Sequence, residues 1–211
     1  MDVSILIFYN KDRGYLSQAI SSAYGQIFSG TFEVVQQSAD LSTSANLNEG
    51  IKKCKGKYIK LLCDDDKLTI NSIQDLYDKA QEGYDVVCAN SLIINNRGIV
   101  KDTYSSYIPR DVHILANDNT LHGGTMFYKK DLLYFDETLK FAEEFELHLR
   151  LANHGYKFGN VDTFVYQYRL HDNQKSMQGG FTDSKKYLAR KRYIRDNIVL
   201  KYQGNYKKII K

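Results

Sequence analysis

The chain has 211 residues, of which 43% are hydrophobic and 26% are charged, a balance typical of a folded protein rather than a disordered one. Its three cysteines are too few and too scattered for a disulfide framework. The sequence shows no signal-peptide pattern and no apolar run of about 18 residues. These features disfavour a secreted disulfide scaffold and an integral membrane protein, and they lead us to expect a cytoplasmic location.

The net charge of +4 is unevenly distributed along the chain. Residues 182–211 hold ten Lys/Arg and two Asp/Glu, which leaves 19 basic and 23 acidic residues in the rest of the chain. Because a nucleic-acid reader usually carries its basic surface on the recognition fold itself, we expect no nucleic-acid partner. The basic tail could instead make a weak contact with an anionic membrane surface.

Strands and helices alternate at short spacing through the first half of the chain. An unbroken apolar run at residues 3–9 predicts a strand that is buried on both faces. The predicted elements are, in chain order, a strand at 3–9, a helix at 15–24, a strand at 32–37, a helix at 47–54, a strand at 58–63, a helix at 70–80 and a strand at 84–89. This alternation predicts an α/β fold built from βαβ units, with a largely parallel sheet.

The second half of the chain changes character. A turn at residues 95–98, Asn-Asn-Arg-Gly, predicts a small antiparallel hairpin. The elements predicted after it are a strand at 125–128, a helix at 143–154 closed by Gly155, a strand at 163–169 and an amphipathic basic helix at 184–202. We expect one domain at residues 1–180 and a basic helical tail at residues 181–211. The tail would pack on the domain through Tyr187, Leu188, Ile194 and Ile198.

Three adjacent carboxylates, Asp64, Asp65 and Asp66, directly follow the predicted strand at 58–63. Ligands of open α/β sheets bind at the carboxyl ends of the strands. Three negative charges at one place repel one another unless a cation neutralises them, and oxygen ligands of this kind suit Mg²⁺ or Mn²⁺. The alternative is a solvated acidic turn that caps the following helix.

Three weaker features each have a structural and a functional interpretation. Glu143 and Glu144 open a predicted helix, where the helix dipole favours negative charge in any protein. His171 follows a predicted strand, and it is either an ordinary loop residue or a ligand for Mn²⁺. The pair Gly123-Gly124 forms either a plain tight turn or a place where the backbone approaches a ligand closely.

Six segments between residue 3 and about residue 176 match the motifs of one enzyme family in order and spacing. They are Val3–Asn10 (VSIIIPTYN in the family), Tyr15–Gln26 (YLxxAIxSxxxQ), Asn48–Leu68 (NxGIxxAxGxYIxxLDxDDxL), Gly124–Lys130 (GxxMxFRR), Phe135–Leu151 (FDExLxxxEDxDLxLRL) and Tyr166–Ser176 (YxYRxHxxxxS). Each motif is weak alone, but the series resembles the inverting family-2 glycosyltransferases with the GT-A fold. The resemblance implies a mostly parallel central sheet flanked by helices, with a small antiparallel addition and a C-terminal helix.

The resemblance also implies a role for each candidate residue. Glu144 takes the family position of the general base, which removes the proton of the acceptor hydroxyl. Asp66 and His171, with Asp64 beside them, would hold Mn²⁺ or Mg²⁺. The residues implied at the donor nucleotide are Tyr9, Ser38, Asp40, Asp64, Asp65 and Arg169, and those implied at the acceptor and the transferred sugar are His122, Gly123, Gly124 and Glu143.

The sequence departs from the family pattern in four places. The proline of the first motif is absent, with Phe8 in its neighbourhood, and Glu144 stands where the family usually has an aspartate base. Ser38-Ala39, with Asp40 next to them, stand where the family has an acidic pair that grips the uracil ring. The first aspartate of the family's DxD motif falls on Cys63, which implies that the acidic group here lies in a slightly different register. Arg169, Lys175 or both could add positive charge to the donor diphosphate.

Together these features predict a metal-dependent inverting glycosyltransferase. It would move a hexose from a nucleotide-diphosphate sugar, most readily a UDP-sugar, to a hydroxyl of a glycan or glycoconjugate. Two alternatives stay open. One is a non-catalytic sugar-nucleotide-binding module, which the changed residues 38–40 favour. The other is a sugar nucleotidyltransferase, which should carry a Gly-rich basic loop after the first strand, and residues 10–14 are not such a loop.

Overall fold

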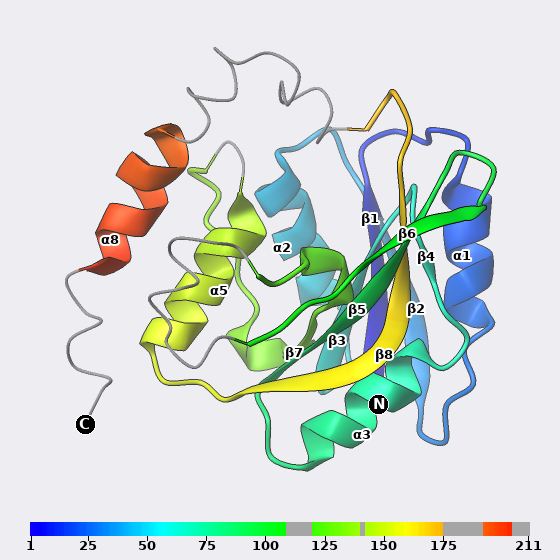
Figure 1. Cartoon of the computed structure of the whole chain (residues 1–211), viewed down its shortest axis with the longest axis horizontal. Coiled ribbons are helices and arrows are strands. Elements are labelled where there is room, and N and C mark those ends of the chain that lie inside the picture. Colours follow the sequence, from blue (N-terminus) through cyan, green and yellow to red (C-terminus); the bar gives the residue numbers. More distant parts are fainter. Residues whose placement is uncertain (109–119, 140–141, 175–191, 204–211) are drawn as a thin grey trace.

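A computed structural model describes residues 1–108, 120–139, 142–174 and 192–203 of the chain. One twisted sheet of eight strands crosses these residues in the order β2-β1-β3-β7-β5-β8-β4, with β6 paired to β5 (Figure 1). Helices cover both faces of the sheet, so the α/β fold that the sequence predicts is confirmed.

The first half of the sheet is regular and parallel. Strand β1 (Val3–Tyr9) lies between β2 (Phe32–Ser38) and β3 (Tyr58–Cys63), and both pairings are parallel. Helices α1 (Leu16–Tyr24) and α2 (Thr43–Lys53) make the connections. The apolar runs of β1 and β3 are buried along almost their whole length, as expected for strands with helices on both sides.

The second half mixes parallel and antiparallel pairing more than the sequence predicts. Its elements are β4 (Lys67–Leu68), α3 (Ser72–Gln81), β5 (Val86–Ile94), β6 (Val100–Tyr104), β7 (Phe127–Lys129), α5 (Glu143–Asn153) and β8 (Phe158–Arg169), with short 3₁₀ helices at Gly123–Thr125 and Lys130–Leu132. The short β7 joins the halves, because it pairs antiparallel with both β3 and β5. The β5–β8 pair is parallel, whereas β5–β6 is the expected antiparallel hairpin.

Three element boundaries differ from the sequence prediction for visible reasons. The strand predicted from residue 125 begins at Phe127, because residues 123–125 form the 3₁₀ turn. Strand β5 runs on to Ile94, where it pairs with β6. Strand β8 begins at Phe158, five residues before the alternating pattern starts, because its first residues pair with β5.

The core is divided between the two faces of the sheet. Residues of α2 and α5 pack with Leu6 and Leu61 on one face, whereas residues of α1 and α3 pack with Ile5 and Leu62 on the other. Side chains of a strand alternate between faces, so the buried strands supply both layers. The carboxyl ends of β1, β2 and β3 meet at one edge of this sheet.

The described part of the tail consists of helical residues that pack on α5. A π-helical stretch (Arg195–Val199) runs into the short α8 (Leu200–Gln203). Ile198 is fully buried and Ile194 packs against the same core cluster, which agrees with the apolar face predicted for the tail. Tyr187 and Leu188 lie outside the described residues, as does the predicted boundary at 180/181. Among the described residues, no helix is long and apolar enough to span a membrane.

Candidate functional site

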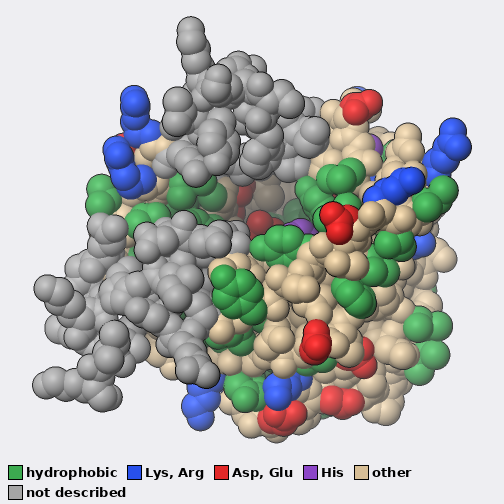
Figure 2. All heavy atoms as spheres, in the orientation of Figure 1, with side chains coloured by type: hydrophobic (Ala, Val, Ile, Leu, Met, Phe, Trp, Pro, Cys, Tyr) green, Lys and Arg blue, Asp and Glu red, His purple; other side chains and the backbone are tan. Residues whose placement is uncertain are grey.

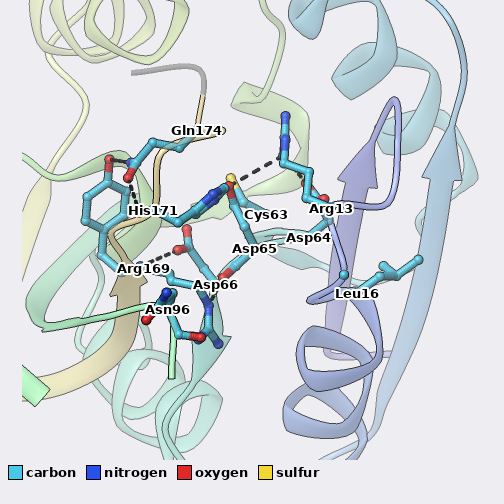
Figure 3. A network of polar contacts seen from close by, with 12 residues as sticks. Arg13, Leu16, Cys63, Asp64, Asp65, Asp66, Asn96, Arg169, His171 and Gln174 are labelled. Carbon is cyan, nitrogen blue, oxygen red and sulfur yellow. Dashed lines mark hydrogen bonds and ion pairs between the residues drawn. The ribbon is translucent and has the colours of Figure 1, made fainter. Parts of the chain in front are cut away.

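An acidic turn, Cys63–Asp66, follows β3 at the edge where the parallel strands end. The Asp66 N–H donates to the Cys63 carbonyl at 3.3 Å, which closes the turn. Residues from the β1–α1 loop and from the end of β8 converge on it (Figure 3). The strand-end cluster predicted from the sequence is therefore present, and its three carboxylates occupy three different environments.

Asp66 is the innermost carboxylate and is 2% exposed. Its Oδ1 accepts the Arg169 backbone N–H at 2.7 Å and its Oδ2 accepts the Tyr166 hydroxyl at 2.8 Å. Burial and the neighbouring Asp65 raise its pKa well above the ordinary value, although the two hydrogen bonds oppose that rise. Asp66 thus ties the acidic turn to β8.

Asp65 is the carboxylate that faces His171. Its Oδ2 lies 3.1 Å from His171 Nε2, and its side chain keeps 13% exposure. One ligand atom each from Cys63, Asp65 and Asp66 lies within 4.8 Å of the others, a spacing that could hold a metal ion. The 3.1 Å between Asp65 and His171 is the length of a hydrogen bond, and it is also close to the spacing of two adjacent ligands on a cation with bonds of about 2.1 Å.

Asp64, expected beside the metal, points instead toward the β1–α1 loop. Its Oδ1 accepts from Arg13 Nη1 at 2.7 Å, and its Oδ2 is buried with no hydrogen-bond partner among the described residues. Burial raises its pKa to about 6, and the Arg13 guanidinium limits the rise. In the metal set expected from the sequence, Asp66, Asp64 and His171, it is Asp65 rather than Asp64 whose carboxylate faces His171. Arg13 Nη1 binds Asp64 more closely than Asp65, whose Oδ2 lies 3.5 Å away.

Arg169, expected to contact the donor diphosphate, is 1% exposed and makes most of its bonds inside the protein. Its Nε donates to the Asp65 carbonyl at 2.7 Å, and its terminal nitrogens donate to Gln18 and to the carbonyls of the β5–β6 turn. Its guanidinium also stacks 4.3 Å from the centroid of Tyr15. Four of its five N–H donors are thus used inside the protein, and its expected contact with the donor diphosphate stays a prediction. Lys175, the other candidate, lies outside the described residues.

A second structural unit, which we call the glycine turn (His122–Met126), lies beside the acidic turn. A Cβ placed on Gly123 would lie 2.7 Å from Cδ of Glu144, and one placed on Gly124 would lie 2.4 Å from Cε1 of Tyr166. Only glycine allows so close an approach. The turn is thus packed between the candidate base on α5 and the tyrosine that holds Asp66.

Glu144 and Glu143 begin α5, after Ala142 in a left-handed conformation. Glu144 lies against Gly123 and is partly exposed, whereas Glu143 is 8% exposed. Burial raises the pKa of the Cys63 thiol well above its ordinary value, and nearby carboxylates, Glu144 among them, add to the rise. Glu144 therefore lies against the glycine turn, and it is near enough to the acidic turn to affect the pKa of Cys63.

His122 is enclosed by aromatic rings. The ring centroids of Tyr104, Tyr166 and Tyr168 lie 5.4, 6.0 and 5.0 Å from its own. Burial, with Lys60 as a second cause, lowers its pKa to about 4. His122 is therefore neutral near pH 7, and its ring is packed among these tyrosines.

The residues expected at the nucleotide lie along the same strand edge. Tyr9 is half-buried at the end of β1, directly opposite Ser38 at the end of β2. Ser38 and Asp40 are exposed. A cavity of about 300 Å³ opens next to the acidic turn and is lined by Arg13, Tyr15 and His171 together with residues of the β5–β6 turn and of the segment after β8. Figure 2 shows acidic and histidine side chains on the floor of a hollow on this side of the molecule.

Three residues of the site were missed by sequence reasoning. Arg13 neutralises Asp64, Tyr166 holds Asp66, and Lys60 is buried under the glycine turn. The sequence could have pointed to Lys60, because a lysine interrupts an otherwise apolar strand. Arg13 had a weaker signal, since it follows the carboxyl end of the first strand. Tyr166 had none beyond its place in an alternating strand.

The arrangement of sheet, acidic turn and glycine turn defines the GT-A class of glycosyltransferase fold, and comparison with solved structures agrees. Staphylococcus aureus TarS 1-349, crystallised with UDP-GlcNAc, superposes with a TM-score of 0.69 at 17% sequence identity, over 93% of this chain and 66% of that one. A second TarS structure, with UDP, gives a TM-score of 0.65 at 16% identity, over 96% of this chain and 77% of that one.

Residues 15–140, more than half of the chain, match the family model of Glycosyl transferase family 2. The chain belongs to this family. It is 32% identical over 106 residues to the GalNAc(5)-diNAcBac-PP-undecaprenol beta-1,3-glucosyltransferase of Campylobacter jejuni, covering 48% of this chain and 33% of that protein. It is 26% identical over 180 residues to the minor teichoic acid biosynthesis protein GgaB of Bacillus subtilis, covering 81% of this chain and 20% of that protein. The chain thus matches about a third and a fifth of the lengths of these relatives.

Proposed function

We propose that this protein is a metal-dependent inverting glycosyltransferase that transfers a hexose from a UDP-sugar to a hydroxyl group of a glycan or glycoconjugate. The observation that carries the proposal is the pair of Asp65 and His171, whose facing atoms lie 3.1 Å apart at the carboxyl end of β3. Family membership supports the reaction class, and the strand-edge position supports a nucleotide ligand.

Asp65 and His171 would hold the cation, and Asp66 would keep the acidic turn in place through its bonds to β8. Mn²⁺ or Mg²⁺ bound there would supply positive charge that stabilises the departing diphosphate. Arg13 is a further source of positive charge on this side, since its side chain is 28% exposed and borders the cavity.

Glu144 would act as the general base. Its carboxylate would accept the proton of the acceptor hydroxyl while the hydroxyl oxygen attacks the anomeric carbon of the sugar. The bond from that carbon to the diphosphate oxygen breaks, and its electron pair leaves with the diphosphate. Attack opposite the leaving group inverts the anomeric centre. The acceptor would enter along the glycine turn, where Gly123 contacts Glu144.

Tyr9, Ser38 and Asp40 would contact the nucleotide, because they lie along the strand edge that continues from the acidic turn. A UDP-sugar donor has support from TarS, which shares the fold and was crystallised with UDP-GlcNAc. A glycoconjugate acceptor has support from the Campylobacter relative, whose name describes glucosyl transfer to a polyprenol-linked glycan.

The test is UDP release from UDP-glucose, UDP-GlcNAc and UDP-GalNAc, each with Mn²⁺ or with EDTA, in the presence and absence of a p-nitrophenyl glycoside acceptor. We expect Mn²⁺-dependent release from one donor. UDP binding without any release would favour a non-catalytic binding module, and release that survives EDTA would contradict the metal site. GDP-mannose serves as the control donor, and its preferential use would contradict the proposal that the donor nucleotide is UDP.

A further inference from the structure

Lys60 lies in the middle of β3, is fully buried, and forms no ion pair among the described residues. Burial lowers its pKa to about 7. Placing an ammonium group away from water is costly unless its donors find partners. The cost of burying the Lys60 side chain in the middle of an apolar strand must therefore be offset by specific contacts of its ammonium group.

The partners of the Lys60 ammonium group lie in the glycine turn and on β8. Nζ donates to the carbonyl oxygens of Gly124 and, at 3.3 Å, of Met126. It also lies 4.8 Å from the centroid of the Tyr166 ring. The three donors of a lysine are thus matched by two carbonyls and the face of an aromatic ring. All three partners are next to the proposed site.

These contacts place Lys60 between the two halves of the proposed site. Tyr166, under the ammonium group, donates its hydroxyl to Asp66 of the acidic turn. The glycine turn, whose carbonyls Lys60 binds, contacts Glu144 through Gly123. The turn is also held by two backbone hydrogen bonds of its own, from Thr125 N–H to His122 O and from Met126 N–H to Gly123 O, by the Thr125 hydroxyl bond to the His122 carbonyl, and by contacts with Ser106. Lys60 adds bonds to two carbonyls of the turn from the β3 side.

We propose that Lys60 is a positioning residue that holds the glycine turn against Glu144, and so places the general base relative to the acidic turn. This inference rests on the proposed function and adds to it a residue that touches neither donor nor acceptor. A displacement of about 1 Å in a catalytic group can cost about 10²-fold in rate. Loss of the Lys60 N–H donors should therefore let the glycine turn shift, move Glu144 out of position and lower turnover.

The test is a double-mutant cycle of Lys60→Met and Glu144→Gln, read as UDP release from the donor that the wild-type protein accepts. Lys60→Met keeps the apolar stem and removes the donors. We expect it to lower kcat by about 10- to 100-fold in the wild-type background and by less than about threefold in the Glu144→Gln background, because interacting residues are not additive. UDP affinity with Mn²⁺ should stay within about threefold of wild type. Lys101→Met, which changes an exposed lysine on β6, is the matched control and should leave all values unchanged.

Each other result contradicts the inference in a distinguishable way. Equal losses in both backgrounds would show that Lys60 acts independently of Glu144. Loss of Mn²⁺-dependent UDP binding would show that it acts on the acidic turn. If Lys60→Met and Lys60→Gln both fail to fold, as judged by circular dichroism, Lys60 is a core residue only. No UDP release from the wild-type protein would overturn the proposed function as well, whereas active wild type with an additive cycle overturns the Lys60 proposal alone.

Discussion

The acidic turn and the glycine turn lie next to each other but are held by different forces. The acidic turn is fixed by polar bonds from separate parts of the chain: Arg13 from the first loop, and Tyr166 and Arg169 from β8. The glycine turn is fixed by close packing on Glu144 and Tyr166, and by the buried Lys60. One unit brings three carboxylates together, whereas the other packs between one carboxylate, Glu144, and the buried Lys60.

This difference indicates separate roles, with the acidic turn suited to binding a cation and the glycine turn suited to positioning Glu144. A cation requires charged carboxylates, and the bonds from Arg13 to Asp64 and from the Arg169 N–H to Asp66 favour the charged forms against the effect of burial. A general base works best in a position that is set closely, and packing against glycine sets it. Substitutions in the acidic turn should therefore affect the cation, whereas substitutions in the glycine turn should affect turnover with the cation still bound.

The largest effect is expected for Asp65→Ala. It removes the charged group that faces His171, so UDP release should fall by at least about 10³-fold, the size of several kcal/mol of lost charge stabilisation. Asp64→Ala removes a carboxylate that pairs with Arg13 instead, and it should cost at least tenfold less. Initial rates with Mn²⁺ measure both. Asp64→Ala as the more damaging change would restore the metal set expected from the sequence.

Glu144→Gln comes next and tests the base. The amide is nearly isosteric but cannot take a proton, so turnover should fall by about 10² to 10⁴-fold while UDP affinity is kept. Glu143→Gln should cost less than about tenfold, because neighbours on a helix point about 100° apart. Kinetics and UDP titration of the two variants give the comparison. An active Glu144→Gln and an inactive Glu143→Gln would move the base by one residue.

Gly123→Ala and Gly124→Ala sharpen the description of the glycine turn. The new Cβ at residue 123 meets the end of the flexible Glu144 side chain, so it should lower turnover by about 10²-fold with little change in melting temperature. The new Cβ at residue 124 meets the buried Tyr166 ring, and this overpacking should destabilise the protein by about 1–3 kcal/mol. Thermal denaturation separates the two outcomes. Equal destabilisation would mean that both glycines serve packing alone.

The smallest expected effect is on the pH dependence of stability, through His148 on α5, the helix that carries Glu144. Burial lowers the pKa of His148 to about 3, so the folded protein keeps it neutral while the unfolded chain takes up a proton below about pH 6.5. Its contribution to stability is therefore present above pH 6.5 and is lost as the pH falls toward 3. The unfolding free energy of the wild-type protein should fall as the pH drops from 6.5 to 4. In His148→Gln this fall should be less steep, and the slope should differ by at most about 1.4 kcal/mol per pH unit. His154→Gln, at an exposed histidine, is the control, and an unchanged slope for His148→Gln would refute the prediction.

Much of the fold follows from the local pattern of the sequence. The buried runs of β1 and β3 and the apolar spacing of α1, α3 and α5 have their causes within each segment, so they could be predicted. The pairing of β7 with β3 and β5 could not, because antiparallel contacts between distant segments leave no local periodicity. For the same reason the sheet is more mixed than the alternation of strands and helices indicated.

The site divides in the same way. The positions of the acidic turn, Glu144, Gly123 and His171 were readable as motifs. Which carboxylate of the turn faces His171 was not, because the backbone of the turn and the ion pair with Arg13 decide it. The burial of Arg169 was equally hidden, since its partners come from α1 and from the β5–β6 turn, far away in sequence.

Electron paramagnetic resonance of Mn²⁺ titrated into the protein with UDP tests the central claim most directly. The wild-type protein should bind one Mn²⁺ in the presence of UDP, the Asp65→Asn variant should lose that signal, and the Asp64→Asn variant should keep it. Wild-type Mn²⁺ binding in the Asp65→Asn variant would contradict the account, because the cation would then be held without the carboxylate that faces His171.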